Sequence, residues 1–321
     1  MNIVFFMRHF GERGTDVAIY DYALYNEVIL KNKSYIAHIE SQTKSMISYE
    51  KFNARFKIFD LNKLDDIKEI IKEYNINYFY TLMSGEYEAF FRLNEKDLWG
   101  SCKVIKHCVF TNKYPEGDYC FSISNYLNLK EKVELNILPH IVSVQNDTEN
   151  FRENFGIPDS AIVFGRYGGF DQFNITFVHE TIIRVLNENI EKNIYFLFMN
   201  TQEFYKHERL IYLPLNIDLH YKRKFINTCD AMIHARLMGE TFGLAIAEFS
   251  LCNKPIITCK CGDLEHILIL KNRAMIYENK VDLINILTNF KKINDEEDDY
   301  NMYDNYNPDN VMNEFKRLLE H

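Results

Sequence analysis

Two glutamates eight residues apart are the strongest candidates for chemistry in this sequence. Glu240 stands in a polar loop at 236–241, and Glu248 stands about two turns inside a helix predicted at 242–250. Free N–H groups at a helix start and the positive end of its dipole attract an anion such as a diphosphate. Glu248 could then accept hydrogen bonds from sugar hydroxyls attached to that diphosphate, with Glu240 near a second sugar. The alternative is an ordinary helix with both acids in solvent.

The elements that must position these acids follow one another along residues 230–258. Apolar residues 231–234 predict a strand that ends at His234, and residues 255–257 begin the next strand after the helix. His234 would either contact a bound ligand or serve as a buried structural residue. Strand, loop, helix and strand in this order are typical of an α/β domain that binds its ligand at the strand ends.

The same residues resemble a known signature. Glu240, Phe242-Gly243-Leu244, Glu248 and Lys254-Pro255-Ile256-Ile257 are similar to the E-G-F-G-L…E…G-K-P-V-I pattern of retaining GT-B glycosyltransferases, the family 4-like or "group 1" enzymes. The match runs without a gap from Glu240 to Thr258, although Thr241 and Asn253 replace the usual glycines. This resemblance implies an α/β fold of two Rossmann-like doubly wound domains with an interdomain cleft. It also implies a donor that is a UDP- or GDP-linked sugar.

The resemblance implies roles for these residues as well. Gly165-Arg166 matches the G-R pair whose arginine binds the donor diphosphate, Glu240 would hold the donor sugar, and Glu248 the ribose. The phosphates would lie on residues Thr241, Phe242, Gly243 and Leu244. A guanidinium suits the diphosphate because it stays charged and binds two oxygens at once.

One position departs from the family pattern. Asp171 stands where the family usually has a lysine that forms a second cation on the diphosphate. Because a carboxylate there would repel phosphate, another cation must replace the lysine or activity is impaired. We expect Arg236 to be that cation, with the basic run Lys222-Arg223-Lys224 as a further candidate, although such a cluster is usually a solvated helix face.

The first half of the chain predicts a second unit of the same kind. Apolar residues 3–7 lead into a loop at 8–16 that contains Gly14, and helical spacing follows from Val17. By resemblance this loop would face the acceptor and the donor phosphates, whereas a plain tight turn is the alternative. His107 lies in a strand predicted at 103–110, where it would approach the donor sugar or remain a core residue.

Strands and helices continue to alternate, which predicts mostly parallel sheets covered by helices on both faces. Pro139 and Pro158 bracket the crossing between domains, because residues before proline disfavour a helix. We therefore expect an acceptor-side domain at 1–145 and a nucleotide-sugar domain at 146–305. A final helix at 306–321 would pack back on the first domain, and the acidic run 295–299 would be a solvated loop.

The amino-acid composition limits the classes of partner that this chain could have. A net charge of −9 argues against nucleic acid as the main partner. Seven scattered cysteines suggest reduced thiols in the cytoplasm, and the apolar start is too short for a signal peptide. The sequence predicts no cofactor and no metal, since no Asp-x-Asp follows a strand. A glycan, a lipid-linked molecule or a small molecule would be the acceptor, and peripheral membrane contact stays open. A catalytically impaired relative and a sugar-nucleotide epimerase are the alternative functions.

Overall fold

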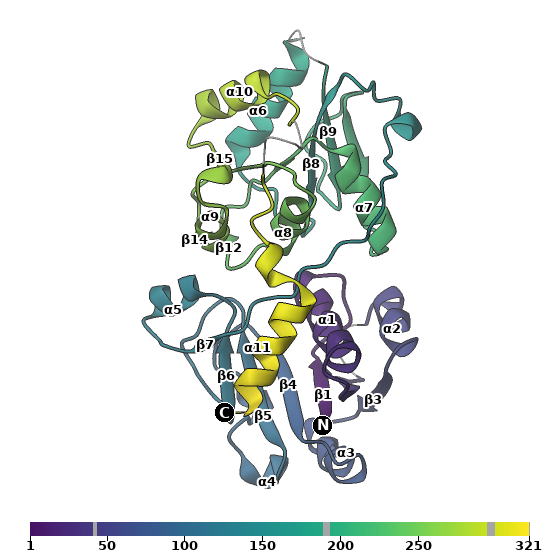
Figure 1. The fold of residues 1–321 in the computed structure, drawn as a ribbon, viewed down its shortest axis with the longest axis vertical. Helices are drawn as coiled ribbons and strands as arrows, with labels where there is room; N and C mark the ends of the chain where they lie inside the picture. The colour runs from purple at the N-terminus through teal and green to yellow at the C-terminus, as the bar shows by residue number, and fades with distance from the viewer. Residues whose placement is uncertain (41–43, 189–192, 294–298, 321) are drawn as a thin grey trace. The chain divides into compact units, whose positions relative to one another are not determined.

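The computed structural model describes residues 1–40, 44–188, 193–293 and 299–320. The chain divides into two compact units, the first formed by Met1–Ile141 with Tyr306–His321 and the second by Val142–Asn305. The crossings therefore fall after residues 141 and 305, compared with the predicted 145 and 305. Each unit is a parallel β-sheet flanked by helices (Figure 1). In the part of the chain that is described, no helix has the length and apolar character needed to cross a membrane.

Unit 1 is built on a seven-stranded parallel sheet in the order β3-β2-β1-β4-β5-β6-β7. Its strands are β1 (Asn2–Met7), β2 (Lys33–Ile39), β3 (Lys57–Leu61), β4 (Tyr78–Met83), β5 (Lys103–Cys108), β6 (Tyr119–Ser122) and β7 (Asn136–Ile137). Its helices are α1 (Gly14–Val28), α2 (Met46–Asn53), α3 (Ile67–Glu73), α4 (Lys96–Trp99), α5 (Asn125–Glu131) and α11 (Pro308–Glu320). The central strands β1 and β4 are mostly apolar, apart from Asn2 and Thr81, because helices cover both of their faces.

Helix α11 completes the core of unit 1 although it lies at the far end of the sequence. It buries Val311, Met312, Phe315, Leu318 and Leu319, an apolar stripe at helical spacing. The ring of Phe315 packs 5.6 Å from that of Tyr22 on α1, centroid to centroid. The last residues of the chain thus close one face of the first sheet.

Unit 2 is built on a six-stranded parallel sheet in the order β10-β9-β8-β11-β13-β15. Its strands are β8 (Ile162–Tyr167), β9 (Ile194–Met199), β10 (Leu210–Leu213), β11 (Ala231–Ile233), β13 (Ile256–Thr258) and β15 (Ala274–Ile276). Its helices are α6 (Thr176–Asn187), α7 (Leu219–Thr228), α8 (Leu244–Leu251), α9 (Glu265–Leu270) and α10 (Lys280–Asn289). A separate pair of two-residue strands, β12 (Gly239–Glu240) and β14 (Asp263–Leu264), lies outside this sheet.

The strand order of unit 2 reverses between β8 and β11. From β8 the chain builds outward through β9 and β10, and it returns to the other side of β8 with β11. Loops that follow two such strands diverge at the carboxyl edge of the sheet, where ligands of this fold class bind. Arg166 lies near the end of β8 and His234 directly follows β11, so both residues stand at this edge.

Two predicted elements differ from those observed. The helix predicted from Phe242 begins two residues later at Leu244, because Gly243 has a left-handed backbone (φ +85°) that ends the preceding loop. The predicted polar loop at 236–241 contains the short strand β12. The acidic run 295–299 lies outside the described residues except for Asp299.

Candidate functional site

Two glycines fix the loop that carries Glu240. Gly239 (φ +63°) and Gly262 (φ +59°) both have left-handed backbones, which disfavour any side chain. A Cβ atom on Gly239 would also lie 2.1 Å from the carbonyl oxygen of Asp263, and one on Gly262 would lie 2.1 Å from the backbone of Met238. The two loops therefore pack backbone against backbone, and the position of Glu240 is set by the main chain.

Glu240 is held by two basic side chains. Arg236 Nη1 donates to Oε2 at 2.8 Å, and His234 Nε2 lies 3.3 Å from Oε1. Burial by itself would raise the pKa of Glu240, but the hydrogen bonds and electrostatic attraction from His234 and Arg236 outweigh it and lower that pKa to about 2. Glu240 is therefore a carboxylate at neutral pH, with both oxygens oriented.

Arg166 lies beside this carboxylate at the end of β8. Its Nη1 donates to the carbonyl oxygen of Asn200 at 3.1 Å and to Thr201 Oγ1 at 2.6 Å, and its Nη2 donates to the carbonyl oxygen of Gly169 at 2.7 Å. Burial lowers its pKa to about 10, while the charge of Glu240 acts in the opposite direction. A guanidinium has five N–H donors, so these three bonds among the described residues leave two for a ligand.

The cation expected to replace the missing lysine is close to this group. Arg236 lowers the pKa of Arg166 by charge repulsion, and Asp171 raises it, so both act on Arg166 at short range. Asp171 is exposed, whereas the Arg236 side chain is only 15% exposed. Two arginines, Arg166 and Arg236, and the hydrogen-bonded carboxylate of Glu240 thus lie near the ends of β8 and β11. Asp171 is the exposed charged residue beside them.

The phosphate-binding segment predicted at residues 241–244 leads directly into α8. Thr241 and Phe242 are buried, and the Phe242 carbonyl accepts a hydrogen bond from the hydroxyl of Tyr303 at 2.9 Å. A Cβ atom on Gly243 would lie 3.4 Å from Cβ of Glu240, so the helix start and the carboxylate are adjacent. Leu244 is the first helical residue and is partly exposed.

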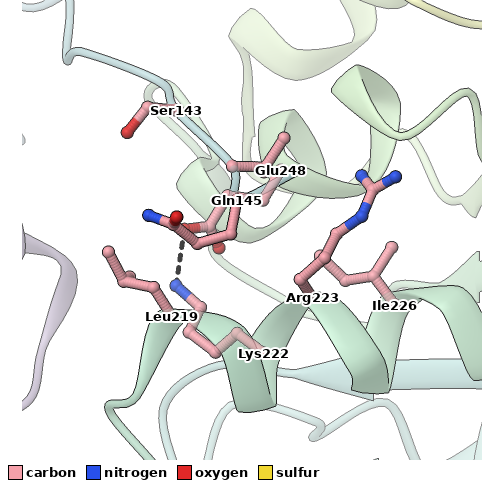
Figure 2. A pocket seen from close by; sticks show the side chains of 8 residues that line it. Ser143, Gln145, Leu219, Lys222, Arg223, Ile226 and Glu248 are labelled. Atoms are coloured by element: carbon pink, nitrogen blue, oxygen red, sulfur yellow. Dashed lines mark hydrogen bonds and ion pairs between the residues drawn. The ribbon is translucent and has the colours of Figure 1, made fainter. Parts of the chain in front are cut away.

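Glu248 has a different set of partners. Its Oε1 accepts from Lys222 Nζ on α7 at 2.5 Å, and its Oε2 accepts from the hydroxyl of Tyr167. Figure 2 shows the Lys222 side chain reaching up from α7 toward this carboxylate. The same group lines a small pocket with Ser143, Val144, Gln145, Leu219, Arg223 and Ile226. Glu248 is buried but still faces a cavity that has polar and apolar walls.

The basic run 222–224 divides into three separate interactions. Lys222 binds Glu248, Arg223 donates from Nε to the carbonyl oxygen of Asp147 at 3.1 Å, and Lys224 pairs with Glu149. Only Lys222 therefore joins a predicted site residue. The sequence alone predicts one basic cluster, because three consecutive residues cannot be assigned to different faces of a helix without knowing what packs against each face.

The two site residues predicted in unit 1 have contrasting surroundings. Gly14 is exposed at the first turn of α1. His107 is fully buried on β5, where its Nδ1 lies 2.6 Å from the hydroxyl of Tyr80. Burial lowers the pKa of His107 to about 3, so it is a neutral imidazole. His107 thus lies in the core of unit 1.

Three partners of the site were not expected from the sequence. Tyr167 follows Arg166 on β8, and because side chains alternate along a strand it points to the opposite face, toward Glu248. Thr258 at the end of β13 contacts His234, and Tyr277 donates to the His234 carbonyl oxygen at 2.7 Å. In the sequence, only the position of Tyr167 directly after the Gly165-Arg166 pair could have indicated one of these partners. Thr258 ends β13 and Tyr277 follows β15, so both are far from His234 along the sequence.

No protein-family model and no curated protein matches this chain. Solved structures do match this chain. A glycosyltransferase from Rickettsia africae ESF-5 has a TM-score of 0.70 at 14% identity, over 100% of this chain and 99% of that one. HepE from Anabaena in complex with UDP-glucose has a TM-score of 0.68 at 11% identity, over 100% and 98%. A Listeria monocytogenes protein assigned as a UDP-N-acetylglucosamine 2-epimerase has a TM-score of 0.63 at 13% identity, over 99% and 95%.

The chain has the two-domain Rossmann-like GT-B fold. Full coverage of both chains in these comparisons, together with two parallel α/β units, supports this assignment. It confirms the predicted fold class. Because transferases and an epimerase share the fold, the arrangement of the site has to decide between activities.

Proposed function

We propose that the protein is a glycosyltransferase that moves a sugar from a nucleoside-diphosphate donor to an acceptor hydroxyl. The observation that carries the proposal is the group formed by Arg166, Arg236 and Glu240 beside the start of α8. Two guanidinium groups next to free helix N–H groups suit a diphosphate, and a fixed carboxylate beside them suits sugar hydroxyls. HepE, a structure of the same fold, was solved with UDP-glucose, so that nucleotide sugar is the first donor to test.

In this proposal the arginines stabilise the leaving group. The bond between the sugar C1 and the diphosphate oxygen breaks while a bond from C1 to the acceptor oxygen forms, negative charge grows on the diphosphate, and the proton of the acceptor hydroxyl passes to an oxygen of that leaving diphosphate. The two free donors of Arg166 and the positive charge of Arg236 would stabilise that charge where it develops. Arg236 thereby takes over from the lysine that Asp171 replaces. No metal is required by this scheme, and retention of configuration is what the sequence resemblance implies.

The carboxylates would hold the two sugars of the donor. Glu240 would accept from hydroxyls of the transferred sugar, with His234 holding its Oε1. Glu248 would accept from the ribose, and Lys222 would release or share Oε1 when the ribose arrives. Backbone groups of Thr241, Phe242, Gly243 and Leu244 would line the phosphates. We assign Gly14 to the acceptor side, and His107 to positioning within unit 1 because it is buried.

The remaining partners follow from the same proposal. The acceptor would be a glycan, a lipid-linked molecule or a small molecule with a free hydroxyl. We place the activity in the cytoplasm, where nucleotide sugars are made, and keep peripheral membrane contact as part of the proposal for a lipid-linked acceptor.

A panel of UDP- and GDP-sugars tests the proposal. Because a ligand that binds only the folded state raises the melting temperature, a donor should be recognised by thermal shift, and transfer to added glycans by product analysis. Glu248→Gln should reduce the shift, whereas Glu188→Gln, which changes an exposed glutamate at the end of α6, should not. Absence of any shift with every nucleotide sugar would reject the proposal.

Two other functions have specific support. The carboxylate of Asp171 at the position of a cation favours a sugar-nucleotide-binding protein without turnover. The Listeria structure favours an epimerase. A thermal shift without product would select the first, and an epimerised nucleotide sugar among the products would select the second.

A further inference from the structure

Three buried side chains form a continuous hydrogen-bonded chain that ends on Glu240, whose own side chain is 19% exposed. His234 Nε2 lies 3.3 Å from Glu240 Oε1, and His234 Nδ1 lies 2.9 Å from Thr258 Oγ1. Thr258 Oγ1 in turn lies 3.2 Å from His266 Nε2. His266 and Thr258 are fully buried, and His234 is 6% exposed. In this series of hydrogen bonds, His266 lies on α9, Thr258 lies at the end of β13, and the carboxylate of Glu240 is the last member.

The chemistry of these groups restricts where the protons can be. An ionised carboxylate only accepts hydrogen bonds, so His234 Nε2 must carry a proton. In a neutral His234 the other nitrogen, Nδ1, has a lone pair, so the hydroxyl of Thr258 donates to it at 2.9 Å rather than to the carbonyl oxygen of Cys259, which lies 3.5 Å away. The Thr258 oxygen then accepts, which requires His266 to be protonated on Nε2. Every donor in this arrangement points toward Glu240.

We propose that Thr258 and His266 are positioning residues that hold His234 in its Nε2–H tautomer and thereby keep its N–H on Glu240. The proposal rests on the glycosyltransferase function above only for its kinetic consequence. Thr258 is the decisive member, because among the described residues its hydroxyl is the only hydrogen-bond partner of His234 Nδ1. His266 keeps that hydroxyl aimed at His234 by donating to its oxygen rather than accepting from it.

Two features separate this role from ordinary core packing. The backbone of His234 is anchored independently, since Tyr277 donates to its carbonyl oxygen at 2.7 Å, so loss of the Thr258 hydroxyl should change the ring and not the strand. Burial lowers the pKa of His266 to about 3, which keeps this residue neutral and leaves its tautomer as the only variable.

A reversed arrangement is the rival. His266 could donate from Nδ1 to the backbone of Glu240, which it faces, and accept from Thr258 on Nε2. Thr258 would then accept from His234 Nδ1, and His234 would carry protons on both nitrogens. The two arrangements differ in the protonation of three ring nitrogens, His234 Nδ1 and both nitrogens of His266, which ¹⁵N chemical shifts distinguish directly.

The test is NMR spectroscopy of the full chain with ¹⁵N-labelled histidine at pH 8. Signals are assigned by the loss of one ring in His234→Phe and in His266→Phe. We expect neutral Nε2–H tautomers for both residues in the wild type. In Thr258→Val we expect His234 to shift toward the Nδ1–H tautomer, and in Thr258→Ser to keep the wild-type pattern. Thr181→Val is the matched control, since Thr181 is equally buried on α6 but bonds only to the Phe177 carbonyl.

Several results would overturn the proposal. A doubly protonated His234 with an Nδ1–H His266 in the wild type would establish the reversed arrangement. A wild-type tautomer in Thr258→Val would show that the hydroxyl does not control the ring. Should Thr258→Val fold poorly, the smaller Thr258→Ala tests the same point. None of these NMR measurements needs an active enzyme. They therefore test the tautomer of His234 even if the proposed glycosyltransferase activity is not found.

The kinetic consequence is measured with UDP-glucose, or with the donor selected by the panel. A misdirected His234 would no longer hold Glu240, so Thr258→Val should lower kcat by about tenfold, equal to about 1.4 kcal/mol, with little change in KM. Thr258→Ser should restore kcat. If Thr258→Val has a shifted His234 tautomer but the same kcat as the wild type, the tautomer of His234 does not affect turnover. That result would reject the positioning role.

Discussion

Glu240 and Glu248 belong to one sequence motif, yet the structure holds them in different ways. Glu240 stands on a loop whose backbone two glycines lock in place, and both of its oxygens are bound, one by Arg236 and one by His234, which Thr258 and Tyr277 hold in turn. Glu248 stands on a helix and is bound by Tyr167 and by the long, flexible side chain of Lys222. The first carboxylate is preorganised, whereas the second is bound by a cation that can leave.

This difference suggests a division of labour between the two acids. A preorganised group contributes most where charge and geometry change during the reaction, which affects kcat. A carboxylate with an exchangeable partner is suited to a ligand group that arrives and departs unchanged, which affects Kd or KM. We therefore expect changes around Glu240 to alter turnover and changes around Glu248 to alter donor affinity.

The largest effect is expected at Arg166, on the Glu240 side. Arg166→Ala should lower turnover at least about a hundredfold, the loss typical of one group that stabilises developing charge. It should also lower the free energy of unfolding by at least about 2 kcal/mol, because three buried acceptors lose their donor. Steady-state kinetics and urea titration measure the two effects. Near-normal turnover in the folded variant would remove Arg166 from the reaction.

The next effect concerns Glu240 itself and depends on pH. Its pKa falls from an ordinary 4.5 to about 2 in the folded protein, so the native state binds this proton less readily than the unfolded state. Its stabilisation is therefore complete above pH 4.5 and is lost as the pH falls toward 2. Glu240→Gln should cost about 2 kcal/mol in urea titrations at pH 7, and the difference from wild type should shrink below pH 4.5. A difference independent of pH would contradict this account.

A smaller effect is expected at Glu248. Glu248→Gln keeps the shape but weakens hydrogen bonds to ribose hydroxyls, so Kd for the donor should rise about tenfold while kcat changes little. Titration calorimetry measures Kd, and Glu188→Gln serves again as the exposed control. An unchanged Kd would separate Glu248 from the ribose.

The smallest effect is expected at Lys222, and its sign is informative. Lys222→Met keeps the apolar part of the side chain but frees Glu248 Oε1, so a ribose no longer competes with an ammonium group. Donor affinity should improve by about threefold, equal to about 0.7 kcal/mol, because the ribose no longer has to displace a cation from the buried carboxylate. Weaker binding would show instead that Lys222 contacts the donor.

Much of this arrangement follows from local sequence. Apolar runs separated by helical spacing predicted the parallel strands, and the G-R and acid motifs predicted which loops carry charge. The start of α8 was placed two residues early because periodicity extends through Phe242, whereas the left-handed backbone of Gly243 delays the helix to Leu244. A conformation imposed on one glycine is not visible in a pattern of apolar residues.

The partners of the site could not be predicted, because they depend on tertiary contacts. Thr258 lies on β13 and reaches His234 only because β13 pairs with β11. Lys222 reaches Glu248 from another helix, because its long side chain extends from α7 to the carboxylate, as Figure 2 shows. Likewise the burial of His107 depends on Tyr80 from the neighbouring strand and on other side chains packed over β5.

One comparison of affinities tests the central claim most directly. UDP and UDP-glucose, or the corresponding pair selected by the panel, are titrated into wild type, Glu240→Gln and Glu248→Gln by calorimetry. We predict that Glu248→Gln weakens binding of both ligands, because both contain ribose, and that Glu240→Gln weakens only the nucleotide sugar. Equal effects of Glu240→Gln on UDP and UDP-glucose, or no effect of Glu248→Gln on either, would contradict the account.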